Sequence, residues 1–452
     1  MKNFGRRSIL QKWSNLKITG LSSDGSGISR TSNGVIFVNG ALPNEIVTAE
    51  IIVRKKDFMI AKLVSIEKES QGRIIPKCKY YGKCGGCQLQ HADYKEQLKI
   101  KSGLVIDAMT RIGNFSDECV KNIKCEASPD EWHYRNKASF PVQAHEKNII
   151  TGFYRAGTHK IEPIKNCPVN AENINHSYKK LLEKIYGRDF NFEGYNEKDH
   201  KGKLRHIILR TGINTGENLL SFVINGRVSQ KNIKTLIQAG SFSEPDTITI
   251  NYNSKPGNII LGEHSEPIFG SGIISERLDE FNLAVDTSSF FQVNTRQAEK
   301  LFTHVKNLVS GEKNILELYS GVGSLTCYLA KNSSVTSIEE WRSAVSMARK
   351  NLKRNNLNVN ALCGKSEDLI CDLSGEFGTV VLDPPRDGCE RTVLEEINRR
   401  AVKKIIYVSC NPSTLARDCK ILSSHGYKLR DIKSFDMFPQ TVHVETVAVL
   451  SK

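Results

Sequence analysis

The sequence predicts three successive parts: a small N-terminal β-barrel, a central region of mostly antiparallel strands, and a C-terminal α/β unit with a parallel sheet. Short apolar segments separated by Gly, Asp and Asn turns fill residues 16–69, a pattern typical of small barrels. Alternating segments recur from about 130 to 285, and strands alternate with helices after residue 290. The expected boundaries of the three parts are 1–70, 71–285 and 286–452.

Composition favours a globular chain with a polyanionic partner. Of 452 residues, 39% are hydrophobic, and 64 Lys and Arg outnumber 49 Asp and Glu to give a net charge of +15. This excess favours nucleic acid or an anionic lipid surface. A mean hydropathy of −0.36, with no apolar run of about 18 residues, excludes a membrane span. Residues 1–10 have the basic start of a signal peptide, but Gln11, Lys12 and Ser14 interrupt an apolar segment, so we expect a cytoplasmic protein.

The N-terminal part is expected to bind nucleic acid. Its predicted strands are Lys17–Thr19, Gly34–Val38, Glu45–Val53 and Met59–Val64. Residues 1–75 contain 12 Lys and Arg but only 6 Asp and Glu. Any one of these cations could simply protect a strand edge, but as a set on an OB-like barrel they favour nucleic-acid contact.

The central part combines a cysteine cluster with a sheet. Cys78, Cys84 and Cys87 lie within ten residues, whereas the other nine cysteines are dispersed, and a cytosolic thiol pool would keep most of them reduced. A polar helix is expected after the cluster. The predicted strands, which suggest an antiparallel sheet, include His206–Arg210, Leu219–Ile224 and Thr247–Asn251.

The C-terminal part alternates strand and helix. Its expected strands are Asn314–Tyr319, Val335–Glu339, Thr379–Asp383, Lys404–Ser409 and Val444–Leu450, and its expected helices include Ser324–Ala330 and Trp341–Asn355. Such alternation predicts a parallel sheet covered by helices on both faces, with ligands at the carboxyl ends of its strands.

A strand that enters a glycine turn, Glu317-Leu-Tyr-Ser-Gly321-Val-Gly323, is the first motif with chemical content. Glycines let a ligand approach the turn closely, and Glu339, 18 residues after Gly321, is placed to bind ribose hydroxyls. Thr326 stands where a dinucleotide site needs a third glycine, and no Gly-Lys-Ser/Thr phosphate loop exists, so NAD and ATP are disfavoured. S-adenosylmethionine is the remaining common choice, and a ligand-free structural turn is the alternative.

Two more strand ends offer reactive side chains. In Asp383-Pro-Pro-Arg386 the prolines favour an extended backbone that aims Asp383 into the crevice. Cys410 lies between a strand and a helix that begins near Pro412, where the helix dipole favours the thiolate. The structural alternatives are a proline-stopped strand with a capping Asp and a buried, inert cysteine.

His443 and Glu445 open the last strand and, two residues apart, share a face. Either could serve as a base, and either could be a solvated strand-end residue. Together with Cys410 they suggest one reaction. A thiolate added to C6 of a pyrimidine makes C5 nucleophilic toward a methyl donor, and a base then removes the C5 proton.

These motifs are similar to the signatures of the bacterial RNA uracil-C5 methyltransferases, S-adenosylmethionine-dependent enzymes that make 5-methyluridine in ribosomal or transfer RNA. The resemblance rests on Asp383–Arg386, Ser409–Asp418 and His443–Val447. It implies a Rossmann-like class I methyltransferase domain with Cys410 as the nucleophile and Glu445 as the base. It also implies a cofactor site, with the ligands Gln292, Tyr319, Glu339 and Asp383. No role for His443 follows from it.

The resemblance extends to the other two parts. Residues 16–69 look like a TRAM domain, an OB-like RNA-binding module. Four cysteines resemble the family's [4Fe-4S] ligands, namely Cys78, Cys84, Cys87 and Cys167. Without the resemblance, a zinc site is equally plausible for four thiolates. In related enzymes the helical stretch corresponding to residues 90–120 packs on the catalytic domain, which would make the central domain discontinuous.

TRAM plus cluster is more usual in relatives that act on 23S rRNA, so 23S rRNA is the favoured substrate, tRNA the alternative, and a monomer is expected. A radical RNA methylthiotransferase is disfavoured, because its cysteine spacing differs and its TRAM module lies at the other end. A non-catalytic RNA-binding protein would not need Cys410 and Glu445. Arg135 could contact RNA or form a salt bridge, and residues 116–130 and 187–203 match no known segment.

Overall fold

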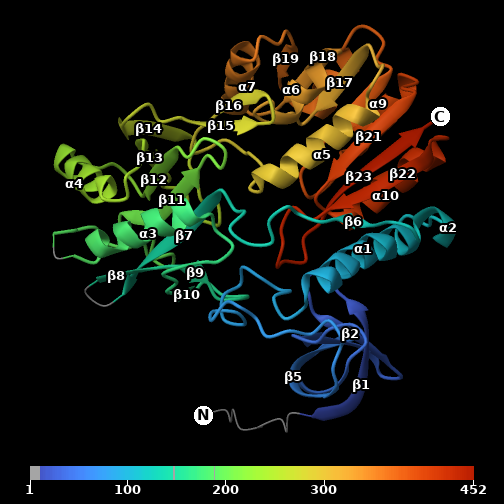
Figure 1. The fold of residues 1–452 in the computed structure, drawn as a ribbon, viewed down its shortest axis with the longest axis horizontal. Helices are drawn as coiled ribbons and strands as arrows, with labels where there is room; N and C mark the ends of the chain where they lie inside the picture. Colours follow the sequence, from blue (N-terminus) through green and yellow to red (C-terminus); the bar gives the residue numbers. More distant parts are fainter. Residues whose placement is uncertain (1–10, 146–147, 188) are drawn as a thin grey trace, which may run out of the picture.

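The computed structural model describes residues 11–145, 148–187 and 189–452, so the basic start at residues 1–10 lies outside the described chain. The barrel (blue), the central sheet (green) and the C-terminal sheet (orange to red) form three bodies around a common centre (Figure 1). No helix in the described part of the chain is long and apolar enough to cross a membrane.

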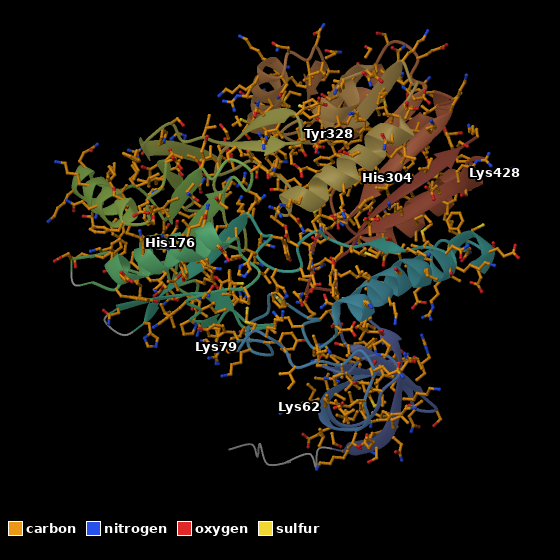
Figure 2. The ribbon with its side chains drawn as sticks, viewed as in Figure 1. Lys62, Lys79, His176, His304, Tyr328 and Lys428 are labelled. Atoms are coloured by element: carbon orange, nitrogen blue, oxygen red, sulfur yellow. The ribbon has the colours of Figure 1, made fainter. Side chains whose placement is uncertain are left out.

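The N-terminal strands close into a five-stranded barrel in the order β1-β2-β3-β5-β4. Its strands are β1 (Lys12–Leu21), β2 (Gly27–Thr31), β3 (Gly34–Asn39), β4 (Ile46–Arg54) and β5 (Phe58–Lys68). Alternate side chains such as Ile18, Ile36 and Val38 are fully buried inside it, as a period of two residues requires. The sequence did not predict β2, which has a single large apolar residue, Ile28. Lys62 projects from the barrel surface (Figure 2).

The central sheet has six strands in the order β14-β13-β12-β11-β7-β8. They are β7 (Lys137–His145), β8 (Asn148–Thr151), β11 (Leu204–Thr211), β12 (Asn218–Ile224), β13 (Thr247–Tyr252) and β14 (His264–Phe269), and α3 (Glu172–Ile185) and α4 (Gln230–Ser241) accompany them. The prediction of antiparallel pairing was wrong for β12 and β13, which are parallel. The crossover through α4 returns the chain in the same direction, as parallel neighbours require. The strands β9 (Phe153–Tyr154) and β10 (Ile161–Glu162) form a separate two-stranded sheet.

The C-terminal sheet has eight strands in the order β19-β18-β17-β20-β21-β23-β22-β6. Its strands are β17 (Asn314–Leu318), β18 (Ser334–Glu339), β19 (Asn360–Cys363), β20 (Thr379–Leu382), β21 (Lys404–Ser409), β22 (Lys428–Phe435), β23 (Glu445–Ser451) and β6 (Cys125–Glu126). Its helices are α5 (Thr295–Leu308), α6 (Ser324–Ala330), α7 (Arg342–Arg354), α8 (Ser366–Asp372), α9 (Arg391–Arg399) and α10 (Pro412–Ser424). A hairpin of β15 (Ile274–Leu278) and β16 (Phe281–Val285) precedes them.

The predicted parallel sheet is confirmed for β17 to β21, but its last strand runs the other way. β23 runs antiparallel to both β21 and β22. Residues 436–444 turn the chain back after β22, so β23 enters the sheet from the edge at which β21 ends. The reversal has a chemical consequence, because it brings the first residue of β23 to the carboxyl edge of the parallel strands.

A segment from the N-terminal half joins this C-terminal layer. The helix α1 (Tyr94–Arg111) packs against α10, and after the short α2 (Asp117–Val120) the strand β6 pairs in parallel with β22. Figure 1 shows α1 alongside β6 and β22, between the barrel and the C-terminal sheet. The expected domain boundaries stay a prediction.

Candidate active site

Four of the predicted site residues lie at one edge of the C-terminal sheet. Tyr319 follows β17, Glu339 ends β18, Asp383 follows β20 and Cys410 follows β21, so the parallel register brings their backbones to the same edge. Glu445 joins them from the antiparallel β23, whose next residue, Thr446, pairs with Ser409. The edge therefore collects a thiol and three carboxyl groups from four strands, together with the phenol of Tyr319 from a fifth.

The glycine turn is built for close approach of a ligand. Gly321 and Gly323 have φ angles of +58° and +81°, values that glycine adopts without strain. The Glu339 carboxylate accepts hydrogen bonds from the backbone N–H groups of Gly321 and Trp341, each at 2.9 Å. Tyr319 also has a positive φ, +66°, and its side chain packs against the apolar core on one face of the sheet.

Glu317, inside β17, belongs to this site although the sequence analysis gave it no role. Its side chain is 2% exposed and its Oε2 atom has no hydrogen-bond partner. Burial, with smaller contributions from the charges of Asp383 and Glu339, raises the pKa of Glu317 to about 8. An acidic residue in the middle of an otherwise apolar strand is unusual, and this pattern could have identified Glu317 from the sequence.

The thiol of Cys410 lies in an electrostatic group with Glu445, Asp383 and Arg386. Burial raises the pKa of Cys410 to about 11, with smaller contributions from the charges of Glu445 and Asp383, while Arg386 acts in the opposite direction. In the free protein, burial and the two carboxyl groups thus oppose the effect expected from the helix dipole, and the role of Cys410 as nucleophile stays a prediction.

The two carboxyl groups of this set resist ionisation. Burial raises the pKa of Asp383 to about 7. Burial and the charge of Asp383 hold the pKa of Glu445 well above its ordinary value, although Arg386 opposes them. With a pKa of about 11, Cys410 is therefore a thiol at neutral pH in the free protein. Such shifts are typical of groups that exchange protons during a reaction.

Gln292 lies in a segment that contacts from the central sheet hold in place. Lys137 of β7 donates from Nζ to the carbonyl of Thr287 at 3.0 Å, and Arg210 of β11 donates from Nη2 to the carbonyl of Ser289 at 2.7 Å. The carbonyl of Gln292 itself accepts from Nδ2 of Asn136 at 2.9 Å. Gln292 is 7% exposed, and its role as a cofactor ligand stays a prediction.

Comparison with known proteins identifies the family of this chain. The family model of tRNA (Uracil-5-)-methyltransferases matches residues 273–452, and the TRAM domain model matches residues 14–64. An uncharacterized RNA methyltransferase of Clostridium acetobutylicum is 37% identical over 437 residues, which cover 95% of this chain and 94% of that protein. One of Staphylococcus epidermidis is 36% identical over 443 residues, covering 96% of each chain.

The chain belongs to the RNA uracil-5 methyltransferases. A solved structure, the tRNA (uracil-54, C5)-methyltransferase of Pyrococcus abyssi in complex with S-adenosyl-L-homocysteine, is similar over 97% of this chain and 100% of that one. The TM-score is 0.77 and the sequence identity is 30%. The predicted resemblance is thus confirmed, as are the methyltransferase fold and the N-terminal TRAM barrel.

The four cysteines of this RNA methyltransferase lie near one another but do not form a metal site in the described residues, where no group of three or more His, Cys, Asp or Glu is arranged to hold an ion. Burial raises the pKa of Cys84 to about 11 and of Cys87 to about 12, and nearby thiols, including Cys167, add to both. The fold has thus brought Cys167 to a cluster some 80 residues earlier in the chain. Their role as ligands stays a prediction.

His443 and Arg135 lie close to the site. Burial lowers the pKa of His443 to about 4, with Arg386, Lys101 and Arg135 acting in the same direction, so this imidazole is neutral at physiological pH. Arg135 donates from Nε to the carbonyl of Lys137 at 2.9 Å. Neither residue gains a functional role from these contacts alone.

The raised pKa of Glu317 gives a test of the site's electrostatics. In the folded protein the pKa is about 8, above its ordinary 4.5, so the stability this carboxyl contributes is full below pH 4.5 and is lost as pH rises through 8. Glu317→Gln mimics the protonated form. We expect the variant and the wild type to have the same melting temperature near pH 4.5. At pH 8 the variant should melt several degrees higher, since each kcal/mol of unfolding free energy shifts the melting temperature by roughly 2–4 °C.

The control is Glu376→Gln, at an exposed position, for which the difference from wild type should not change with pH. Parallel melting curves for Glu317→Gln and the wild type from pH 4.5 to 8, measured by scanning calorimetry, would contradict the assignment.

Proposed function

We propose that this methyltransferase uses S-adenosylmethionine to methylate C5 of a specific uridine in 23S rRNA, with Cys410 as nucleophile and Glu445 as base. The observation that supports this most is the convergence of Cys410, Glu445, Asp383 and Glu339 at one strand edge. The Pyrococcus abyssi enzyme was solved with S-adenosyl-L-homocysteine, the product that S-adenosylmethionine leaves after methyl transfer.

The charge of the edge suits a cationic methyl donor. Glu317, Glu339 and Asp383 influence one another electrostatically, and no hydrogen bond satisfies Oε2 of Glu317 in the described structure. A sulfonium or ammonium cation next to these carboxyl groups would stabilise their ionised forms. Glu339, already oriented by two backbone N–H groups, is placed for ribose hydroxyls. Gln292 and Tyr319 complete the proposed cofactor ligands.

Cys410 and Glu445 divide the covalent chemistry between them. The Cys410 thiolate forms a bond from Sγ to C6 of the uracil, and the ring electrons move toward C5. The bound cofactor supplies an electrophilic methyl group to C5. Glu445, as a carboxylate, then takes the proton from C5, the C6–Sγ bond breaks, and the electron pair returns to Sγ as the thiolate leaves.

These reaction steps require a thiolate at Cys410 and a carboxylate at Glu445. Arg386 favours the thiolate of Cys410 and the carboxylate of Glu445. A cationic cofactor beside Asp383 acts in the same direction, because it offsets the negative charge that otherwise raises the pKa of both groups. The free enzyme thus keeps its nucleophile in the less reactive thiol form.

Two RNAs are candidates for the substrate. The combination of a TRAM domain with the four cysteines resembles enzymes that act on 23S rRNA. A tRNA uridine is the second candidate, because the Pyrococcus abyssi relative acts on uracil 54 of tRNA and matches nearly the whole chain. In either RNA, the uridine must leave its stack so that Cys410 can reach C6.

Cys78, Cys84, Cys87 and Cys167 are the proposed ligands of a [4Fe-4S] cluster. The fold brings these four thiols to one neighbourhood, and thiolates are the ligands such clusters use. A cluster there would join residues 78–91 to the loop that holds Cys167.

Cells that lack the gene should lose one or more 5-methyluridines. We expect wild-type protein to restore the modification in 23S rRNA, and Cys410→Ala to reduce methyl transfer below detection, because C5 cannot be activated without the thiolate. Mapping of 5-methyluridine in total RNA measures both. Loss from tRNA instead would favour the second candidate. Full activity of Cys410→Ala would refute the nucleophile assignment, provided that the purified variant binds RNA like the wild type.

Glu445→Gln should stop the reaction after methyl transfer. The amide cannot remove the C5 proton, so the methylated uracil stays bonded to Cys410. We expect a covalent RNA–protein adduct that survives denaturing electrophoresis, and no such adduct from Glu445→Gln combined with Cys410→Ala. Rapid turnover by Glu445→Gln would exclude it as the base.

Anaerobically purified protein should contain iron and sulfide in about a 4:4 ratio per chain, as a four-iron cluster requires. Cys87→Ser should lower both, whereas serine at the exposed Cys371 should lower neither. Elemental analysis together with sulfide determination provides the measurement. Stoichiometric zinc, or no metal at all, would overturn the cluster proposal.

A further inference from the structure

Within residues 11–145, 148–187 and 189–452, no hydrogen bond orients the carboxyl group of Glu445. Only burial and the charges of Asp383 and Arg386 act on it in the described structure. The position of a carboxyl group without such bonds depends on how firmly the backbone of its own residue is held. One side of that backbone is strand β23, and the other is the irregular segment 436–444 that leads into it.

The segment 436–444 has no regular secondary structure, yet it is mostly buried. Contacts from several other elements hold it. Asn294, at the start of α5, donates to the carbonyl of Met437 at 3.3 Å, and Tyr134 donates from its hydroxyl to the carbonyl of Pro439 at 2.9 Å. The backbone N–H of Asp436 donates to the carbonyl of Glu126 at 2.9 Å.

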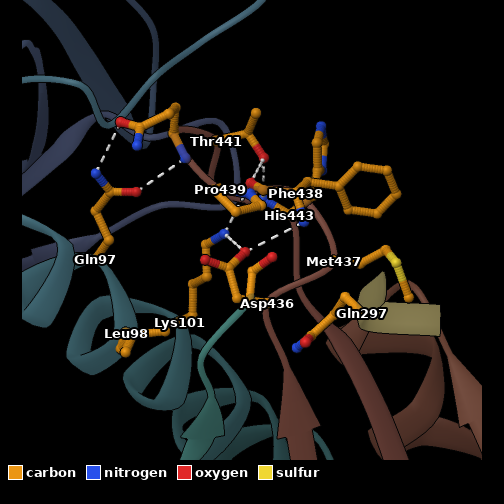
Figure 3. A network of polar contacts seen from close by, with 12 residues as sticks. Gln97, Leu98, Lys101, Gln297, Asp436, Met437, Phe438, Pro439, Thr441 and His443 are labelled. Carbon is orange, nitrogen blue, oxygen red and sulfur yellow. Dashed lines mark hydrogen bonds and ion pairs between the residues drawn. The ribbon is translucent and has the colours of Figure 1, made fainter. Parts of the chain in front are cut away.

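The strongest of these contacts come from α1. Lys101 is fully buried and forms an ion pair with the equally buried Asp436. From the same Nζ it donates to the carbonyl of Phe438 at 2.9 Å. Figure 3 shows Lys101 reaching from α1 into the turn formed by Asp436 and Phe438. Removing either partner would leave an unpaired charge in the interior, so this contact fixes the start of the segment.

One turn earlier on α1, Gln97 forms a pair of amide contacts with Gln440. Its Nε2 donates to Oε1 of Gln440 at 3.0 Å, and its Oε1 accepts from the backbone N–H of Gln440 at 2.9 Å. Gln440 has a φ angle of +73°, a conformation a non-glycine residue adopts only when its surroundings hold it. Its carbonyl accepts from the backbone N–H groups of Gln88 and Leu89 at 3.1 and 2.9 Å.

We infer that Gln97, Lys101 and Gln440 are positioning residues for proton removal, which hold Glu445 in register with Cys410 by fixing the segment 436–444. This rests on the proposed role of Glu445. Gln440 also connects the segment to residues 88–89, directly after Cys87. The stretch that contains Cys78, Cys84 and Cys87 therefore also helps to hold the segment 436–444. Geometric errors of about 1 Å at a reacting group can cost 10²-fold in rate.

The test uses Gln97→Leu, which removes both contacts with Gln440. It also uses Gln440→Asn, which keeps a residue tolerant of positive φ but shortens the side-chain amide, so that the contact with Nε2 of Gln97 is lost. The control is Lys99→Leu on the same helix, where the side chain is 74% exposed and pairs only with Glu96. The substrate is total RNA from cells that lack the gene.

Each positioning variant should lower kcat about 10- to 100-fold. KM for RNA should fall with it, so that kcat/KM changes little, because proton removal follows methyl transfer. A larger fraction of folded enzyme should be trapped as a covalent RNA adduct at steady state, because proton removal is the step that slows. Lys99→Leu should behave as the wild type. General destabilisation would lower the active fraction without adding adduct, so the adduct per folded enzyme separates the two explanations.

Wild-type kcat in a folded Gln97→Leu or Gln440→Asn, or a lower kcat without added adduct, would overturn the inference. If Gln97→Leu fails to fold, Gln440→Asn decides alone. Failure of the proposed function would look different. If the proposed function is wrong, Glu445→Gln itself accumulates no adduct. If Glu445→Gln does accumulate the adduct but both positioning variants turn over normally, the proposed function stands and only the positioning inference is rejected.

Discussion

The exclusion of water from the carboxyl edge of the sheet is the constraint on which the rest of this enzyme depends. Glu317 and Glu445 are buried and Asp383 and Cys410 are partly so, and burial is the first cause of the raised pKa of all four groups. Such groups destabilise the fold when they ionise, so the surrounding structure must hold them in place without relying on their own hydrogen bonds. A cationic cofactor and a uracil would supply the partners that the free edge lacks.

Support for that edge comes largely from the N-terminal half of the chain. The strands of the central sheet hold the segment before Gln292 through Lys137 and Arg210, and α1 holds the segment before Glu445 through Lys101. The TRAM barrel is attached to the same assembly, since the fully buried Glu45 pairs with Arg73 in the linker. The RNA-binding module and the reacting groups therefore share one continuous scaffold.

The sequence predicted the elements that have strong local signals. The glycine turn, the strand ends at Asp383 and Cys410 and the TRAM barrel each combine an apolar run with turn residues, which a local pattern can identify. It did not predict the direction of β13 or of β23, because strand direction depends on the path of the connection. Lys101 looked like an ordinary residue of a polar helix, since its buried partner, Asp436, lies 335 positions away.

The burial of Glu317 and the raised pKa of Cys410 also could not be predicted from the sequence, because both depend on contacts between distant segments. A helix N-terminus lowers a thiol pKa by a local effect that is visible in sequence, whereas desolvation and the charge of Glu445 depend on the assembled sheet. The reversed strand β23 creates that charge contact, because a parallel strand would have placed Glu445 at the opposite edge. One turn of nine residues thus brings the proposed base to the nucleophile, which explains why so many buried contacts converge on 436–444.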